Sequence, residues 1–287
     1  MIKILVTGAN GQLGKCLKDG VLDYPEFDVL FTARKDLDIE KKEVISEFFR
    51  NHSFDYCINT AAYTNVEKAE SEPDAAFSIN ANAVKNLSEA CEINDVILLH
   101  ISTDYVFDGE QNRPYVESDA TNPINVYGDS KLKGEQYIED ICRKHFIFRT
   151  SWLYSQYGHN FLNTILKYGK EGKPLTITTE QVGTPTNAND LAKAILEVID
   201  SKSEAYGLYH YSNEGEATWY DFAKAILTFS GHLTPTNLAK TDHYRTFAAR
   251  PKYSVLDKSR INRILEIRMI GWETSLKLLI EKTTTNT

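Results

Sequence analysis

A glycine-rich loop directly follows the first apolar segment of the chain and strongly constrains its fold. Apart from Lys3, residues 2–7 are apolar or β-branched, as in a strand. Glycines follow at positions 8, 11 and 14, and residues 14–22 have helical periodicity. Glycines in this context let the backbone turn sharply and approach a pyrophosphate, and amides at a helix N-terminus attract that anion. The alternative is a glycine-rich turn without a ligand. The predicted cofactor-binding residues of this loop are Gly8, Asn10, Gly11, Gln12, Leu13 and Gly14.

Short apolar segments alternate with amphipathic segments along the first 150 residues. This alternation predicts an α/β fold with a doubly wound parallel, Rossmann-type sheet. After about Trp152 the rhythm changes, which predicts a smaller, interleaved C-terminal substrate domain. We expect an NADP-binding domain over residues 1–183, plus a returning strand near 207–212. The substrate-binding domain is expected over residues 184–206 and 213–287.

Composition excludes several classes of function. The net charge is -8, and Lys and Arg are interspersed with acids, so we expect no nucleic-acid partner. No apolar run approaches the ~20 residues of a membrane span, so we expect no membrane partner. The four cysteines form no C-x-x-C pair and indicate reduced thiols in a cytoplasmic protein. The seven histidines show no metal-ligand spacing.

Two cations follow the second predicted strand, where nicotinamide cofactors are distinguished. Arg34 and Lys35 stand where an acidic residue would favour NAD by binding the ribose 2′-hydroxyl. Their charge suits a 2′-phosphate, so we expect NADPH to be preferred, with NADH as a second cofactor. The alternative is a solvated basic turn. Asp38 and Ile39 are expected to flank the adenine.

Tyr127 and Lys131 lie four residues apart, on one face if the segment is helical. An ammonium beside a phenol lowers the phenol pKa, and such a tyrosine can exchange a proton with a substrate oxygen. Thr103 closes a predicted strand at the sheet edge where ligands bind, and its hydroxyl can polarise a ketone. Chance spacing and a strand-end cap are the alternatives. We predict Tyr127, Lys131 and Thr103 as catalytic residues.

Together these motifs resemble those of the extended short-chain dehydrogenase/reductases and, more narrowly, of the dTDP-4-dehydrorhamnose reductase family. The narrower resemblance covers nearly the whole chain, in residues 61–70 (AAYTNVEKAE), 102–109 (STDYVFDG), 149–154 (RTSWLY), 183–186 (GTPT) and 250–257 (RPKYSVLD). It implies reduction of the C4 ketone of dTDP-4-dehydro-β-L-rhamnose by NAD(P)H. Tyr127 would donate the proton, Thr103 would orient the carbonyl, and Lys131 would hold the ribose.

The resemblance also implies further site residues. Those at the cofactor would be Ala61, Ala62, Tyr63, Asn80 and Ser102, in addition to Tyr127 and Lys131. Those at the dTDP-sugar would be Thr103, Asp104, Tyr105, Trp152 and Arg250. Trp152 could instead be a core aromatic residue, and Arg250, expected at the diphosphate, could instead form a surface ion pair.

One departure from the family concerns magnesium. Some members dimerise through a magnesium site that uses a glutamate just after the glycine loop, where this chain has Lys15. Asp190 matches a second acidic ligand, but a single carboxylate does not form a site. We therefore predict no magnesium site, and a monomer or a weak homodimer.

Two other functions stay open at this stage. One is a related nucleotide-sugar 4-ketoreductase or an epimerase, although Arg34 and Lys35 favour exchangeable NADPH over the retained NAD of an epimerase. The other is a non-catalytic regulatory subunit resembling that of methionine adenosyltransferase. The intact set of Thr103, Tyr127 and Lys131 favours catalysis.

Overall fold

The largest sheet confirms the expected doubly wound parallel architecture. In residues 1–234, 237–242 and 246–285, which the computed structural model describes, this sheet has six parallel strands in the order β10-β5-β4-β3-β1-β2. The strands are β1 (Ile2–Thr7), β2 (Phe27–Thr32), β3 (Tyr56–Asn59), β4 (Ile97–Thr103), β5 (His145–Thr150) and β10 (Gly207–His210). The chain passes from β1 to β2 at one edge and returns to β3 on the other side of β1. This reversal places a crevice at the carboxyl ends of β1 and β3.

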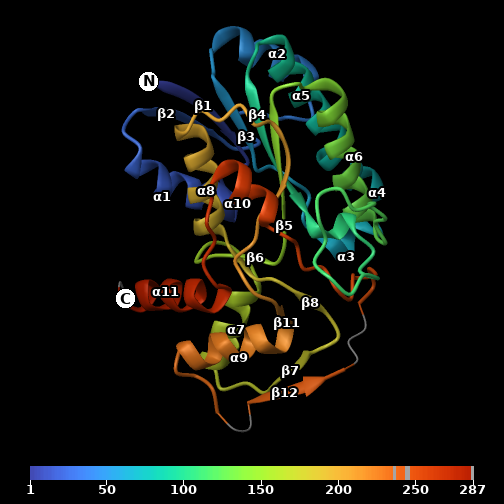
Figure 1. The fold of residues 1–287 in the computed structure, drawn as a ribbon, viewed down its shortest axis with the longest axis vertical. Helices are drawn as coiled ribbons and strands as arrows, with labels where there is room; N and C mark the ends of the chain where they lie inside the picture. Colours follow the sequence, from blue (N-terminus) through green and yellow to red (C-terminus); the bar gives the residue numbers. More distant parts are fainter. Residues whose placement is uncertain (235–236, 243–245, 286–287) are drawn as a thin grey trace.

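Helices cover both faces of this sheet (Figure 1). One face packs against α1 (Gln12–Gly20), α8 (Ala188–Asp200) and α10 (Ser259–Leu265). The other packs against α2 (Lys42–Asn51), α5 (Ala83–Ile93) and α6 (Val126–Ile141). Successive strand residues point to opposite faces, so Ile4 enters the first core and Leu5 the second. Both are fully buried, which explains why the strands are largely apolar.

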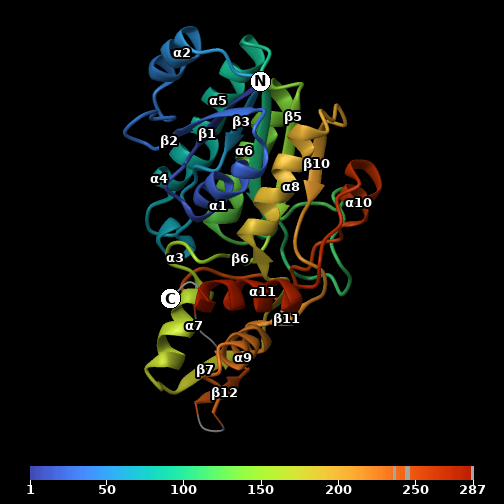
Figure 2. The same ribbon diagram turned by 90° about the vertical axis from the view of Figure 1, so that its left-hand side faces the viewer.

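A smaller lobe lies beyond the carboxyl ends of the strands (Figures 1 and 2). It contains α7 (Phe161–Lys170), β7 (Leu175–Thr178), α9 (Trp219–Phe229), β12 (Leu238–Thr241) and α11 (Trp272–Thr285). β7 pairs with β12 in a separate two-stranded sheet. Leu162, Phe222 and Leu276 from the three helices pack in one cluster, so this lobe has its own core.

Two segments differ from the expected domain ranges. The range 1–183 assigns α7 and β7 to the cofactor domain, but both lie in the smaller lobe, because their apolar side chains pack against α9. The range 184–206 assigns α8 to the substrate domain, but α8 packs on α1 and the large sheet. β10 pairs with β5, within the range 207–212 that is expected to return to the large sheet.

Short elements complete the described chain. They are η1 (Val21–Asp23), α3 (Val66–Ala69), α4 (Pro73–Phe77), η2 (Ser78–Asn82), η3 (Asp104–Val106), β6 (Leu153–Tyr154) with β9 (Thr186–Asn187), and β8 (Val182–Gly183) with β11 (Ala217–Thr218). The π-helical turn η2 joins α4 and α5, and such turns often occur at functional sites. Here the turn carries Asn80, which is fully buried.

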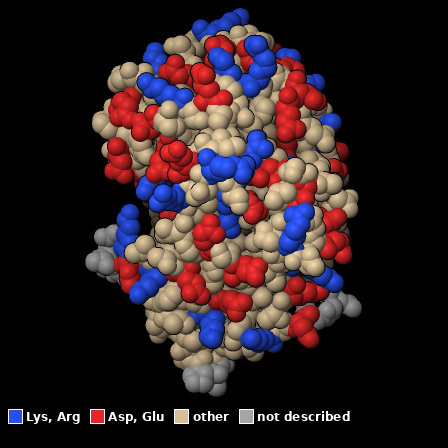
Figure 3. Space-filling model, in the orientation of Figure 1, with Lys and Arg blue, Asp and Glu red and all other residues tan. Residues whose placement is uncertain are grey.

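The surface has a mixed distribution of charge. Basic and acidic side chains are interspersed over the face drawn in Figure 3. Over the described ranges, none of the helices is both long and apolar enough to cross a membrane.

Candidate active site

Two adjoining cavities lie at the carboxyl ends of the large sheet. The first, of about 350 Å³, runs from the glycine loop past Arg34, Asp38 and Ile39. The second, of about 540 Å³, runs from the same loop past Thr103, Tyr127 and Lys131 towards the smaller lobe. Four residues line both cavities: Asn10, Gly11, Thr60 and Ala62. The two cavities therefore form one cleft long enough to connect the phosphate loop with the predicted catalytic residues.

The glycine loop fits a pyrophosphate. Gly8 has a φ of +71°, and a Cβ at this position would lie 2.5 Å from the Ala61 nitrogen, so no larger residue fits. Gly14 has no Cβ, and this lets α1 approach the loop closely. A Cβ at this position would lie 2.7 Å from the Gly8 carbonyl oxygen. The first turn of α1 contains no acidic residue, and no side chain caps its N-terminus. Its amides are thus suited to an anionic ligand, as the sequence predicts.

The other end of the first cavity carries both signs of charge. Arg34 lines it, and its guanidinium donates to Glu40 Oε2 at 2.5 Å and lies 3.8 Å from Asp38 Oδ1. Glu40 also accepts a hydrogen bond from the Ser78 hydroxyl at 2.7 Å. Sequence reasoning missed Glu40, because nothing in the local pattern showed that it turns back to Arg34. Lys35 is exposed and is not among the residues that line this cavity.

Tyr127 lies in the first turn of α6 and faces the end of β4. The helix begins there because the Asn125 side chain accepts a hydrogen bond from the Gly128 amide at 2.7 Å. Tyr127 and Thr103 line the same cavity, and the Tyr105 ring lies 5.9 Å from the Tyr127 ring at an angle of 80°. The structure thus brings together the expected hydroxyl and phenol.

The expected lowering of the Tyr127 pKa is not found. Burial raises the pKa of this phenol above its ordinary value, the neighbouring Thr103 hydroxyl lowers it, and Asp104 and Tyr105 raise it further. The sequence argument is wrong here because it assumed that the Lys131 ammonium faces the phenol. Lys131 is directed elsewhere: its Nζ donates to the Ile101 carbonyl oxygen at 2.6 Å and lies 3.2 Å from His100 Nε2.

Lys131 is almost completely buried, at 2% exposure. Burial lowers the pKa of its ammonium to about 8, although Glu135 acts in the opposite direction. Burial likewise raises the pKa of Asp104 to about 6, against the effect of hydrogen bonds with Ser254 and Thr103. The cleft therefore holds a lysine and a carboxylic acid whose pKa values are both shifted towards neutral pH by burial, which is typical of active sites.

Aromatic residues line the part of the second cavity next to the smaller lobe. Trp152 stacks on Trp219 with ring centroids 3.7 Å apart and an interplanar angle of 9°. Trp152 has a φ of +46°, which is a strained backbone conformation for a bulky residue. This conformation orients the Trp152 side chain. Sequence reasoning missed Trp219, which comes from the distant helix α9. Arg250 lines the same cavity and donates to Glu67 Oε1 at 2.8 Å, so it forms an ion pair within the site.

Three other predicted residues support the cleft without turning their polar groups into it. Asn80 holds the loop after β3, because its side-chain amide exchanges hydrogen bonds with the backbone of Tyr63 at 2.9 and 3.0 Å. The Tyr63 hydroxyl donates to Glu72 at 2.7 Å. Ser102 lines the second cavity, but its hydroxyl donates to Glu135. Of the remaining predicted residues, Ala61 lines the first cavity, and Gln12, Leu13, Asp104 and Tyr105 line the second.

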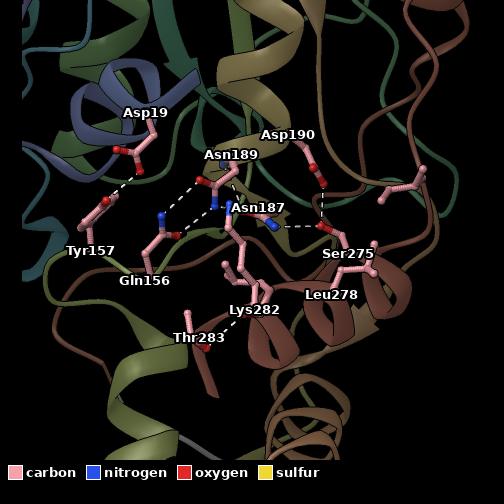
Figure 4. A pocket seen from close by; sticks show the side chains of 12 residues that line it. Asp19, Gln156, Tyr157, Asn187, Asn189, Asp190, Ser275, Leu278, Lys282 and Thr283 are labelled. Carbon is pink, nitrogen blue, oxygen red and sulfur yellow. Dashed lines mark hydrogen bonds between the residues drawn. The ribbon is translucent and has the colours of Figure 1, made fainter. Parts of the chain in front are cut away.

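A separate cavity of about 400 Å³ lies where α1, α8 and α11 meet (Figure 4). Asp190 lines it, but Asn213 and Ser275 donate to its carboxylate at 2.7 and 2.5 Å. The Lys15 ammonium lies 5.6 Å from the centre of the Tyr157 ring. Within the described part of the chain, no three His, Cys, Asp or Glu side chains are grouped so that they could hold a metal ion.

We therefore expect metal removal to have no effect. Dialysis against EDTA should leave the sedimentation coefficient and the rate of NADPH oxidation unchanged, because a cation at position 15 opposes a divalent ion. Analytical ultracentrifugation and the oxidation assay, each with and without added magnesium, measure this. A change in mass or a loss of activity that magnesium restores would contradict the prediction.

Known proteins resemble the chain over nearly its whole length. The profile of the family described as RmlD substrate binding domain matches residues 2–285. A dTDP-4-dehydrorhamnose reductase of Salmonella typhimurium is 37% identical, over all of both chains. The crystal structure of a dTDP-4-dehydrorhamnose reductase from Clostridium acetobutylicum has a TM-score of 0.93 and 38% identity, covering 99% of this chain and 100% of the other. That of Bacillus anthracis, in complex with NADP, has a TM-score of 0.93 and 36% identity, covering 98% and 100%.

Proposed function

The chain belongs to the RmlD substrate binding domain family, and from this membership we propose that it reduces the C4 ketone of dTDP-4-dehydro-β-L-rhamnose with NADPH, forming dTDP-β-L-rhamnose. The observation that carries the proposal is the position of Thr103 and Tyr127 in one cavity, between the phosphate loop and the Trp152–Trp219 pair. That arrangement connects a dinucleotide site to an aromatic surface suited to a sugar nucleotide.

Tyr127 is the proton donor of this reaction. Bound NADPH supplies a hydride to the carbonyl carbon. The carbonyl oxygen then gains negative charge and takes the proton of the Tyr127 hydroxyl. The raised pKa of Tyr127 keeps the phenol protonated before the reaction. The resulting alcohol and phenolate balance the hydride and the proton that are transferred.

Thr103 and Lys131 assist the proton donor. The Thr103 hydroxyl donates to the carbonyl oxygen and stabilises the charge that develops there. It lies at the end of β4, where its single proton is directed at Asp104 Oδ1 over a long 3.1 Å, and the hydroxyl must rotate towards the carbonyl oxygen when the substrate binds. Lys131 lines the same cavity, although its Nζ is directed at Ile101 and His100 in the structure. When charged, its ammonium attracts the phenolate across the cavity and holds the nicotinamide ribose.

The substrate residues come from both parts of the molecule. Trp152 and Trp219 contact the sugar nucleotide through their ring faces, because stacked aromatics give large contact areas. Arg250 recognises the diphosphate, for which its planar guanidinium is suited, while Glu67 holds it in place. A purely regulatory binding protein would need neither Tyr127 nor Lys131 in the cleft.

A direct spectrophotometric assay tests the reaction. The purified protein is mixed with NADPH and dTDP-4-dehydrorhamnose, and oxidation is followed by the loss of NADPH absorbance. Chromatography then resolves the rhamnose product from its epimers. We expect turnover only when both substrates are present. No turnover, or a product of another configuration, would overturn the assignment.

The charges around Arg34 predict how the cofactor is discriminated. Glu40 pairs with Arg34 at 2.5 Å and so competes with a 2′-phosphate for the same guanidinium. We expect Glu40→Gln to tighten NADP⁺ binding relative to NAD⁺ by about 3- to 10-fold, and Arg34→Ala to weaken it. Titration calorimetry with each dinucleotide measures both ratios, and Glu47→Gln on the exposed face of α2 is the matched control. An unchanged ratio in Arg34→Ala would show that Arg34 does not read the phosphate.

We also propose a cytoplasmic location and a monomer or weak homodimer. Cys16, Cys57, Cys91 and Cys142 are all buried and unpaired, as is common in proteins of a reducing compartment. Lys15 in place of a metal ligand supports the weak self-association.

A further inference from the structure

A row of buried polar side chains crosses the large sheet next to the catalytic lysine. Thr7 of β1, Asn59 of β3 and His100 of β4 are paired in register on adjacent strands. Each is at most 1% exposed. The Thr7 hydroxyl donates to Asn59 Oδ1 at 2.7 Å, and Asn59 Nδ2 lies 3.1 Å from His100 Nδ1. The reaction described above uses none of these groups.

The amide of Asn59 determines which nitrogen of His100 carries the proton. Asn59 Oδ1 also accepts a hydrogen bond from the Ala61 amide, at 3.2 Å, and a backbone N–H can only donate. This contact identifies Oδ1 as the oxygen and leaves Nδ2 as a donor towards His100. Nδ1 of His100 must then be the acceptor, because two donors do not form a hydrogen bond. A neutral imidazole with a bare Nδ1 carries its proton on Nε2.

That proton points at Lys131. His100 Nε2 and Lys131 Nζ are 3.2 Å apart. An ammonium has no lone pair and cannot accept from Nε2–H, whereas an uncharged amine can. Protonation of His100 does not occur in place of this, since burial, together with the Lys131 charge, keeps the pKa of His100 well below its ordinary value. The contact is therefore satisfied only when Lys131 is an amine.

We propose that His100 is a positioning residue for the reaction: fixed by Asn59 with its proton on Nε2, it donates to Lys131 Nζ and stabilises the uncharged amine. This deepens the proposed function, because Lys131 is then a group that gains and loses its proton readily near neutral pH. A lysine of that kind can stabilise the Tyr127 phenolate as an ammonium and can also give a proton away.

The other groups around Lys131 act in the opposite sense or are neutral. Glu135, one turn along α6, raises the pKa of Lys131 and is itself paired with Arg149 of β5 at 2.6 Å. Tyr127 on α6 stays protonated in the ground state. β1 and β3 contribute only the uncharged Thr7 and Asn59. His100 is thus the neighbour that favours the amine through a hydrogen bond.

Nitrogen-15 NMR of the purified protein tests the tautomer directly, without any activity measurement. We expect His100 Nδ1 to give a pyridine-like shift and Nε2 a pyrrole-like shift. His210 is the internal reference of opposite type, because its Nδ1 lies 3.1 Å from the Tyr115 carbonyl oxygen, which only accepts, so its Nδ1 carries the proton. A pyrrole-like shift at His100 Nδ1 would overturn the proposal.

Asn59→Asp tests the consequence for catalysis. The carboxylate keeps the acceptor for Thr7 and Ala61, but its second oxygen accepts from His100, so the proton should move to Nδ1. Nε2 then accepts from Lys131 and stabilises the ammonium. Because activity requires the ammonium, the rate of NADPH oxidation should persist to a pH about one unit higher than in the wild type.

The two measurements separate the possible failures. The tautomer of His100 could reverse in Asn59→Asp while the alkaline limb of the pH–activity profile does not shift. That result would show that His100 does not control the charge of Lys131. His210→Gln, which alters a buried histidine of β10, two strands from β4, should not move the limb. If the wild-type protein had no reductase activity, the NMR result would still decide the tautomer, and the proposed function alone would fail.

Discussion

Tyr127→Phe should lower the turnover number by roughly 10²–10⁴-fold, the usual contribution of a positioned proton donor. The substitution removes only the hydroxyl from a half-buried ring that packs against Tyr105 and lines the second cavity. The alkoxide that forms at the sugar carbon then has no proton donor in place. The affinity for NADP⁺ should remain within a few-fold of the wild-type value, because the glycine loop and Arg34 are untouched.

Tyr137→Phe is the matched control for this experiment. Tyr137 lies on the same helix, but its ring contacts the ammonium groups of Lys85 and Lys133, at 5.3 and 4.7 Å, and does not line the cleft. Steady-state kinetics should give wild-type turnover for this control, and calorimetry should give equal NADP⁺ affinity for both variants. Near-wild-type turnover of Tyr127→Phe would remove Tyr127 as the proton donor.

Lys131→Met should have the second-largest effect, with a loss of activity of about 10²-fold or more and weaker cofactor binding. Methionine fills similar space in the buried site but supplies no charge to the Tyr127 phenolate and no donor to the ribose. The two effects together distinguish this variant from Tyr127→Phe, which should change turnover alone. Turnover and the NADP⁺ dissociation constant are measured side by side.

Lys133→Met provides the corresponding control on α6. Its ammonium interacts with Gln136 and the Tyr137 ring, outside the cleft. We expect both measured quantities to be unchanged in this variant. If Lys131→Met kept wild-type turnover and affinity while remaining folded, the role assigned to the lysine would be wrong.

Most of the fold could be predicted because local patterns and burial agree in the first half of the chain. Strands such as β1 and β3 are largely apolar because helices cover both faces of the sheet, and the glycine loop marks where the first strand ends. The smaller lobe was harder to assign. α7 and α8 are both amphipathic, and only the tertiary contacts show that α7 packs with α9 while α8 packs on α1.

The site could be predicted where spacing carries the chemistry, as in Tyr127, Lys131 and the glycine loop. It could not be predicted where distant segments meet. Trp219 stacks on Trp152 and Glu40 turns back to Arg34 only in the folded chain. The direction of a side chain could not be predicted either. Lys131 lies on the expected face of α6, but its ammonium is directed at Ile101 and His100. The pKa of Tyr127 is therefore raised by burial and not lowered by the lysine.

The most direct test follows the hydride itself. NADPH carrying deuterium at both positions on C4 of the nicotinamide is incubated with the protein and dTDP-4-dehydrorhamnose, and the product is examined by NMR. We predict dTDP-β-L-rhamnose with one deuterium at C4 of the sugar and a matching amount of NADP⁺. A product without deuterium at C4, or a deuterated product with the opposite configuration at C4, would contradict the assigned reaction.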